Sequence, residues 1–332
     1  MKKTKESFIH WSEKKEQAGY LRVKILLKLF LILPIMMLRI IAFPVGFFYF
    51  VFSKKTRDDS NYFLHRAAPF ITNPKTAKKC QSIFRSLRHI VSFALTLIEK
   101  MESWGGKFPF KQIYFQDDDI NDLIERLENK KGAVLICSHL GNTELLRGLA
   151  SFNRTGVSRR ISVTSIIDTE ISAHFTRIIK ELNPESAMEI INAKNINPDT
   201  VLYLEKKLID GGLVVIAGDR TQADGNEKTI MIPFLDEEAP FSVGAFYLAA
   251  LLHMPIYYVF ALRRGELSIY PKYDMHVYKN KISTERSKEY SKKERFEYST
   301  LLVRSFAEML ETHCKNHPFQ WYNFYNFWSK GA

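Results

Sequence analysis

Short apolar runs alternate with amphipathic segments over the second half of the chain. Two five-residue runs are apolar throughout, residues 133–137 (AVLIC) and 213–217 (LVVIA). Such runs are typical of strands buried on both faces of a parallel sheet. Since helical patterns lie between the runs, the alternation predicts an α/β fold, with a mixed and largely parallel sheet flanked by helices.

The same reasoning assigns the other elements. Strands are predicted at residues 161–167, 188–191, 256–262 and 267–277. Helices are predicted at residues 60–104, 119–129, 143–152, 173–182, 199–210, 242–253 and 284–315. A chain of 332 residues is long enough for one large α/β domain with an appendage, or for two modest domains.

The segment of residues 25–52 contains only two charged residues, Lys28 and Arg39. Its length would allow a membrane span, but Arg39 divides it and Pro34 and Pro44 should kink it. A kinked span, a re-entrant hairpin, a helix in the membrane interface and a buried helix all remain open. We predict a basic and hydrophobic membrane anchor at residues 1–58 and an α/β domain at residues 59–332.

The formal net charge is +12, from 48 Lys and Arg against 36 Asp and Glu. Such an excess favours anionic partners, and basic residues on both sides of residues 25–52 suit an anchor with its flanks at a cytoplasmic membrane face. Zinc-finger spacings, RGG tracts and basic heptads are missing from the sequence, so we expect no nucleic acid partner. Three widely spaced cysteines form neither a disulfide framework nor a metal motif, and no metal or cofactor is expected.

The strongest chemical signal is the stretch SHLGNTE, residues 138–144, directly after the first apolar run. His139 would lie at the C-terminal end of a strand, where active sites of open α/β sheets collect, and histidine can take up a proton near neutral pH. Glu144, past a Gly-Asn turn, could fold back onto the imidazole and fix its tautomer. Asn142 would stand beside the substrate, near the N–H groups of the next helix. A structural strand cap at His139 with a solvated Glu144 is the alternative.

The stretch AGDRTQ, residues 217–222, follows the second apolar run. It would place Asp219, Arg220 and Gln222 at the same sheet edge as His139, as substrate-binding residues. Arg220 could bind a phosphate or an oxyanion, and Asp219 could orient it or the acceptor. An ordinary strand-to-loop turn with a surface ion pair is the alternative.

Three further features carry weaker signals. Residues 231–255 combine a proline-containing acidic turn with an apolar helix, which suits core packing or room for an acyl chain. Residues 317–328 contain seven aromatic residues, which suit a membrane interface, a lipid-lined cleft or a tail packed across the core. Cys137 precedes His139 by two residues, and a small buried hydrophobe is favoured over an acyl-cysteine.

Four blocks in this order resemble the bacterial lipid A biosynthesis acyltransferase family, within the lysophospholipid acyltransferase superfamily. They are the HX4E motif His139–Glu144, the AGDRTQ block, residues 233–256, and the PFQW of residues 318–321. The N-terminal apolar segment also matches. Typical members lack the Arg of AGDRTQ and end in a basic segment rather than in WYNFYNFW, so the chain resembles a divergent branch.

The resemblance implies a catalytic role for His139 and an orienting role for Glu144. It implies an acyl carrier protein or coenzyme A thioester as donor, and work at the cytoplasmic face of the bacterial inner membrane. The acceptor would be a hydroxyl or amine of a lipid A precursor, a lysolipid or an amino-acid lipid. Basic residues such as Arg263 and Arg264 would receive an acidic carrier protein. A lipid hydrolase using the same histidine and an inactive membrane-surface binding protein are the alternatives.

Overall fold

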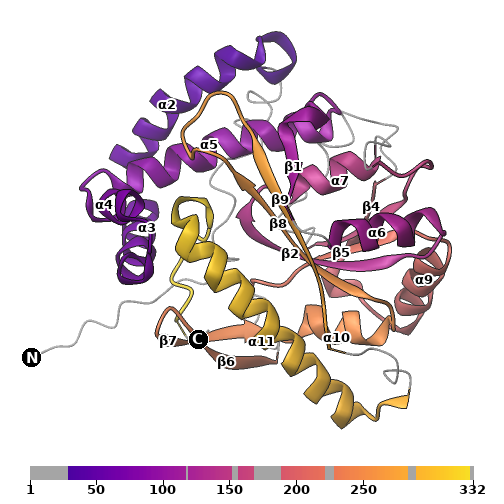
Figure 1. Ribbon diagram of the computed structural model, residues 1–332. Coiled ribbons are helices and arrows are strands. Elements are labelled where there is room, and N and C mark those ends of the chain that lie inside the picture. Colours follow the sequence, from indigo (N-terminus) through magenta and orange to yellow (C-terminus); the bar gives the residue numbers. More distant parts are fainter. Residues whose placement is uncertain are drawn as a thin grey trace, which may run out of the picture.

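The computed structural model describes residues 29–116, 119–151, 156–167, 188–220, 228–282 and 289–329. Seven strands within these ranges form one sheet in the order β1-β9-β8-β2-β5-β3-β4 (Figure 1). The five strands from β8 to β4 run parallel to one another, and β9 joins them antiparallel to β8. The predicted mixed and largely parallel α/β sheet is therefore confirmed.

Most strands match the predicted ranges closely, but β1 was not predicted. The bounds are β1 (Ile113–Phe115), β2 (Ala133–Gly141), β3 (Val163–Ile167), β4 (Met188–Asn192), β5 (Leu213–Ala217), β8 (Ile256–Arg263) and β9 (Tyr273–Lys279). Strand β9, which lies between β1 and β8, begins six residues later than the predicted start at residue 267. It follows a turn in which Gly265 has φ +71° and its carbonyl accepts a 3.0 Å hydrogen bond from the Ser268 amide.

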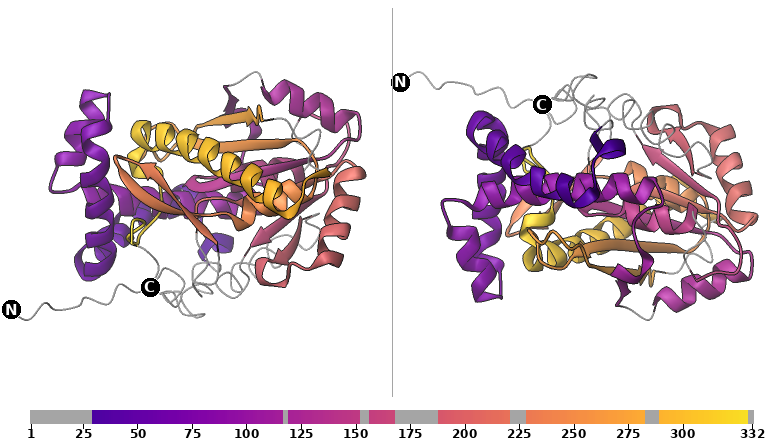
Figure 2. Two further views of the ribbon diagram at one scale, coloured as in Figure 1. Left: turned by 90° about the horizontal axis from the view of Figure 1, so that it is seen from below. Right: turned by 90° about the horizontal axis from the view of Figure 1, so that it is seen from above.

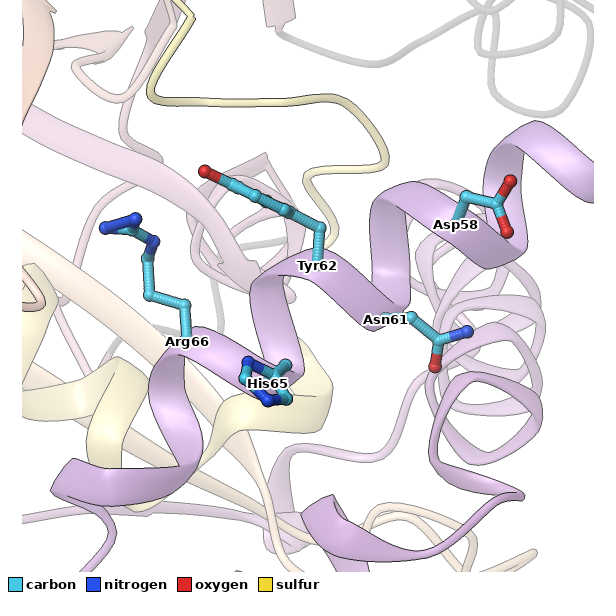
Figure 3. A pocket seen from close by; sticks show the side chains of 5 residues that line it. All are labelled: Asp58, Asn61, Tyr62, His65 and Arg66. Atoms are coloured by element: carbon cyan, nitrogen blue, oxygen red, sulfur yellow. The ribbon is translucent and has the colours of Figure 1, made fainter.

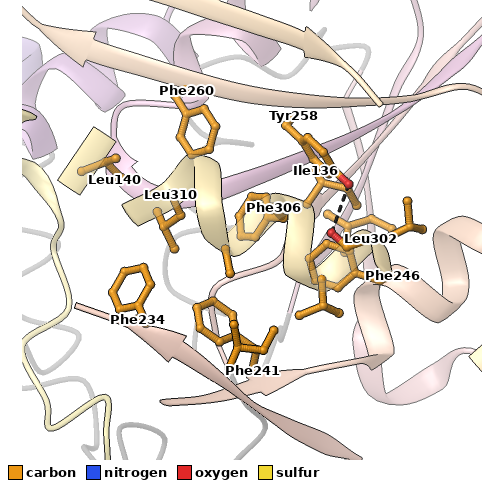
Figure 4. Close-up of a cluster of buried hydrophobic side chains, with 14 of the residues drawn as sticks. Ile136, Leu140, Phe234, Phe241, Phe246, Tyr258, Phe260, Leu302, Phe306 and Leu310 are labelled. Carbon is orange, nitrogen blue, oxygen red and sulfur yellow. Dashed lines mark hydrogen bonds between the residues drawn. The ribbon is translucent and has the colours of Figure 1, made fainter. Parts of the chain in front are cut away.

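Alternate residues of β2 enter separate cores on the two faces of the sheet. Val134 and Ile136 pack into a large core beneath α10 (Gly244–Leu251) and α11 (Lys292–Asn316). Its centre is aromatic, with the Phe306 ring 5.4 Å from Phe246 and 6.0 Å from Phe260 (Figure 4). The odd-numbered residues of β2 pack on the other face, against α6 (Asp119–Glu128) and α7 (Glu144–Ser151).

The region predicted as one long helix at residues 60–104 is divided into α3 (Lys54–Ala67), α4 (Pro74–Gln81) and α5 (Arg85–Trp104). Asn73 caps α4, since its side chain accepts hydrogen bonds from two backbone amides, and Pro74 is its first residue. Both residues favour a helix start over a continuing helix. The helices α9 (Pro198–Ile209), α10 and α11 agree with prediction within a few residues, apart from the start of α11, and the predicted helix at residues 173–182 lies outside the described residues.

A two-stranded hairpin, β6 (Thr229–Phe234) and β7 (Glu237–Ser242), occupies the region predicted as an acidic turn. Its two turn residues, Leu235 and Asp236, have φ values of +51° and +63°. Positive φ at both central positions is the requirement of a type I′ turn, which Asn-Gly usually meets. Leu-Asp carries no such signal, so the hairpin was not predicted.

The apolar helix α2 (Ile35–Phe52) lies alongside α5 at one end of the molecule (Figures 1 and 2). It begins after Pro34 and contains Pro44. Leu38 and Ala42 pack against Val91 and Leu95 of α5. Arg39 is buried in this contact and forms an ion pair with Glu102 of α5. The helix has the length and apolarity of a membrane span, yet 22% of its residues are buried against the protein.

Candidate active site

The site is built where β2 and β5 end side by side. These strands are parallel neighbours in register from Ala133 and Leu213 to Cys137 and Ala217. The Gly218 amide continues the ladder with a 2.8 Å hydrogen bond to the Cys137 carbonyl. The residues that follow on each strand, His139 and Asp219, are thereby brought together, as the strand-end argument predicts.

Asp219 holds both the backbone and the ring of His139. One carboxylate oxygen, Oδ2, accepts the His139 amide at 2.7 Å, and the other, Oδ1, lies 2.8 Å from the imidazole Nδ1. The Asp219 side chain is fully buried, whereas the His139 side chain is 31% exposed. The arrangement is a histidine–carboxylate dyad with a fixed anion behind a partly accessible ring.

The electrostatics favour an ionised Asp219 and a neutral His139. Burial, followed by the nearby Arg220, lowers the pKa of His139 to about 4, although Asp219 opposes this shift. Burial by itself would raise the pKa of Asp219, but His139 and its hydrogen bonds, with Arg220, lower it. The carboxylate therefore accepts Nδ1–H and leaves the lone pair on Nε2. No described residue hydrogen-bonds to Nε2, so this nitrogen can act as a proton acceptor.

Glu144 does not make the predicted contact with the imidazole. Its Oε2 accepts a 2.9 Å hydrogen bond from the indole of Trp104, and its backbone carbonyl accepts one from the Ser103 hydroxyl at 3.0 Å. Glu144 is the first residue of α7, so both contacts tie this helix to the end of α5. The correction follows from the sheet order, since β5 lies next to β2 and brings Asp219 to the imidazole instead.

The turn between His139 and Glu144 depends on Gly141, which has φ +73°. A Cβ atom on Gly141 would lie 1.9 Å from the Ala261 carbonyl oxygen, so the close approach of β8 also excludes a side chain. The next residue, Asn142, donates its amide to the same oxygen at 2.8 Å. Its side-chain amide is buried, and neither polar atom has a hydrogen-bond partner within the part of the chain that the structure describes.

Arg220 is half-buried at the end of β5, within electrostatic range of the dyad and of Tyr325. Burial lowers the pKa of its guanidinium, while Tyr325 and Asp219 act in the opposite direction. A cation at this position opposes protonation of His139 and could bind an anionic group. The predicted substrate residue Gln222 lies outside the described residues.

The segment after α11 completes the site, a role that the sequence did not predict. Trp321 pairs with Leu140 in an isolated antiparallel bridge, and the Tyr322 amide donates to the His139 carbonyl at 3.2 Å. The Trp321 indole donates to Asp219 Oδ2 at 3.0 Å. Three interpretations of the terminal aromatic residues were open, and a tail packed across the core fits best. Five of these residues are buried: Phe319, Trp321, Tyr322, Phe327 and Trp328.

The structure also shows where Cys137 and the two arginines expected on a docking surface lie. Cys137 is buried in the core beneath α6 and α7, consistent with a small hydrophobe. Arg263, expected on a basic docking surface, is fully buried and pairs with Glu99 of α5 at 2.7 Å. Arg264 pairs with Asp274 on the surface. Arg263 therefore fixes β8 to α5 and is not exposed to a carrier protein.

A cavity of about 420 Å³ lies on the outer face of α3, and neither His139 nor Asp219 lines it (Figure 3). Its lining side chains come from successive turns of that helix: Asp58, Asn61, Tyr62, His65 and Arg66. Arg66 stacks over Trp328 at 4.5 Å and pairs with Glu237. The cavity is thus bounded by structural contacts between α3, the hairpin and the terminal segment, and the dyad lies elsewhere.

A neutral histidine backed by a buried carboxylate, at the carboxyl end of a parallel sheet, is an arrangement suited to acid–base catalysis. The model of the bacterial lipid A biosynthesis acyltransferase family matches residues 9–330. The chain belongs to this family and is an acyltransferase that acts on lipid substrates. A search of curated proteins found no match.

Proposed function

We propose that this acyltransferase moves a fatty acyl group from an acyl carrier protein or coenzyme A thioester to a hydroxyl or amine of a lipid acceptor. The observation that carries the proposal is the His139–Asp219 dyad. Its geometry leaves Nε2 unprotonated, partly exposed and without a competing partner among the described residues. Such a nitrogen is suited to general base catalysis.

In the proposed reaction, His139 Nε2 takes the proton from the acceptor as the acceptor oxygen or nitrogen attacks the thioester carbonyl carbon. Asp219 stabilises the imidazolium that forms. The tetrahedral intermediate then collapses, the carbon–sulfur bond breaks, and the proton passes from His139 to the thiolate. The products are an acylated lipid and a thiol, and the histidine returns to its neutral form.

The developing oxyanion requires nearby donors or positive charge. Arg220 supplies a cation that already acts on both members of the dyad. Asn142 supplies a buried amide whose Nδ2 has no hydrogen-bond partner among the residues described, and a substrate oxygen could accept from it. Both therefore remain substrate-binding candidates. Asp219, predicted as a third, is buried with both oxygens engaged by His139 and Trp321, so we assign it the orienting role instead. Glu144 holds helix α7, which begins where the turn ends, against α5.

For the location we propose the cytoplasmic face of the bacterial inner membrane, with α2 lying in the interface. Its outer face carries exposed apolar side chains: Met37, Ile40, Val45, Phe47, Phe48, Val51 and Phe52. Its inner face is held to α5 by the buried ion pair between Arg39 and Glu102. A helix bound lengthwise to the catalytic domain fits a monotopic anchor better than a span. The division of anchor and domain at residue 58 falls within α3.

The test is mass spectrometry of total lipids from cells that express the wild-type chain or a His139→Ala variant, with a strain lacking the gene as reference. A lipid heavier by one acyl chain should appear with the wild-type chain alone, and its mass should identify the acceptor. Released fatty acid without an acylated lipid would indicate a hydrolase instead. Identical profiles in the source organism for all three strains would contradict the transferase and favour an inactive binding protein.

A further inference from the structure

The indole N–H of Trp321 supplies the third hydrogen bond to the Asp219 carboxylate. The other two come from the amide and the ring of His139, at 2.7 and 2.8 Å. The Trp321 bond, at 3.0 Å, shares Oδ2 with the His139 amide, and in the described ranges only the ring hydrogen-bonds to Oδ1. Trp321 and Asp219 are both buried, so water does not compete for this contact.

We propose that Trp321 is a positioning residue that aims the Asp219 carboxylate at His139 and keeps it ionised. The proposal rests on the function of His139 as general base. Trp321 contacts the carboxylate and not the ring, so its effect on the reaction passes through Asp219.

The backbone of Trp321 is fixed from several sides. Its carbonyl accepts a 3.0 Å hydrogen bond from His89 Nε2, and that ring in turn contacts the Ser60 hydroxyl at 2.9 Å. The preceding Gln320 exchanges two 2.8 Å hydrogen bonds with the backbone of Arg263 in β8. The terminal segment is therefore held by α3, α5 and the sheet, and its indole approaches the carboxylate from a defined direction.

The indole ring is also enclosed by aromatic neighbours. Its centroid lies 4.9 Å from Phe63, 5.3 Å from Phe234 and 4.9 Å from Phe327. These rings come from α3, β6 and the terminal segment. A side chain packed in this way cannot rotate its N–H away from Asp219 without a clash, so the donor is preorganised.

A hydrogen bond to the charged form of an acid stabilises that form. If the Trp321 donor is removed, the carboxylate becomes more basic and the dyad holds a proton up to a higher pH. The acid limb of the activity profile and the pKa of His139 should both move upward, by about one to two pH units for a bond to a buried charge.

Trp328 provides a matched control in the same segment. It is also buried, and its indole N–H donates to the backbone carbonyl of Phe234 at 3.1 Å. A Trp328→Phe substitution removes a buried indole and one hydrogen bond, as Trp321→Phe does. It leaves the three donors of Asp219 in place, so it reproduces the packing loss without the proposed electrostatic effect.

The experiment records the kcat/KM pH profile of the full chain and the titration of His139 by NMR with ¹⁵N-labelled histidine, assigned with a His139→Gln variant. Trp321→Phe should shift both to higher pH, and Trp328→Phe should shift neither. If Trp321→Phe fails to fold, the benzothienylalanine analogue, which replaces the N–H by sulfur, serves in its place. Unchanged curves for the Trp321 variant, or equal shifts for both variants, would overturn the proposal.

The NMR titration separates this proposal from the proposed function because it needs no substrate. A His139 pKa that responds to Trp321 supports positioning even if the wild-type chain transfers no acyl group. Transfer that depends on His139, with a titration unaffected by Trp321, would retain the function and reject the positioning role.

Discussion

At the scale of single residues, the proposed chemistry depends on which carboxylate faces His139. The sequence offers Glu144 and Asp219, one five residues away in the same block and the other on a neighbouring strand. In the structure Asp219 hydrogen-bonds to the imidazole, and Glu144 accepts a hydrogen bond from the Trp104 indole. The two acids should therefore respond differently to neutralisation.

An Asp219→Asn substitution should lower kcat by roughly 10³- to 10⁴-fold, because an amide cannot keep His139 in the productive tautomer. It should also change the acid limb of the pH profile. Glu144→Gln should weaken the contact between α5 and α7 and lower kcat without moving that limb. Rate measurements between pH 4 and pH 8, together with thermal unfolding of each variant, would test the difference. A shifted limb in Glu144→Gln alone would return the orienting role to Glu144.

At the scale of elements, the sequence predicts the helices and strands that a local residue pattern determines, and it misses features that depend on distant contacts. The strands β2, β5 and β8 were evident because each is apolar at nearly every position and is buried on both faces of the sheet. The break before Pro74 was missed because helical spacing continues on both sides of it. Trp321 was missed as a site residue, since its partner lies 102 residues away and no local pattern encodes that contact.

The helix α2 should bind membranes through its exposed face. Replacing Phe47 and Phe48 together by Glu should reduce binding to vesicles of phosphatidylethanolamine and phosphatidylglycerol at least tenfold, since two apolar side chains leave the lipid. The matched control is Leu202→Glu with Ile209→Glu, two residues on α9 that are similarly exposed. Flotation assays measure both. Equal losses in the two double variants would argue against a specific role of α2.

The orientation of α2 can be tested separately with single cysteines at Ser12 and Ser53, on either side of the apolar segment. A helix in the interface leaves both flanks on one side, so a membrane-impermeant maleimide should label both from the cytoplasmic side of inverted vesicles. Labelling of the two positions from opposite sides would show a span instead.

At the scale of the whole molecule, His89 joins α3, α5 and the terminal segment through its two ring nitrogens. Burial, against a smaller effect of the Trp321 carbonyl, lowers the pKa of His89 to about 3. The folded protein therefore keeps His89 neutral at pH values where the unfolded chain, with a pKa near 6.5, binds a proton. The stability that His89 contributes is complete above about pH 6.5 and is lost as the pH falls toward 3.

The contribution of His89 should amount to about 1.4 kcal/mol per pH unit within that window. A His89→Gln variant should consequently show a shallower loss of unfolding free energy than the wild type between pH 6.5 and pH 4.5. The exposed His65 supplies the control, and His65→Gln should retain the wild-type slope. Urea unfolding at a series of pH values gives these slopes. Parallel curves for wild type and His89→Gln would mean that His89 takes up protons in the folded state.

The dyad and its supports are assembled from segments far apart along the chain. The contacts of Asp219 with His139 and Trp321 span 80 and 102 residues, and that of His89 with Trp321 spans 232. Contacts of such long range form late in folding, because the intervening chain must first be closed into loops. During refolding, helical signal should thus return well before enzyme activity. A partly folded chain would be helical and able to bind lipid surfaces. It would not yet consume acyl thioesters, because the dyad would not be assembled.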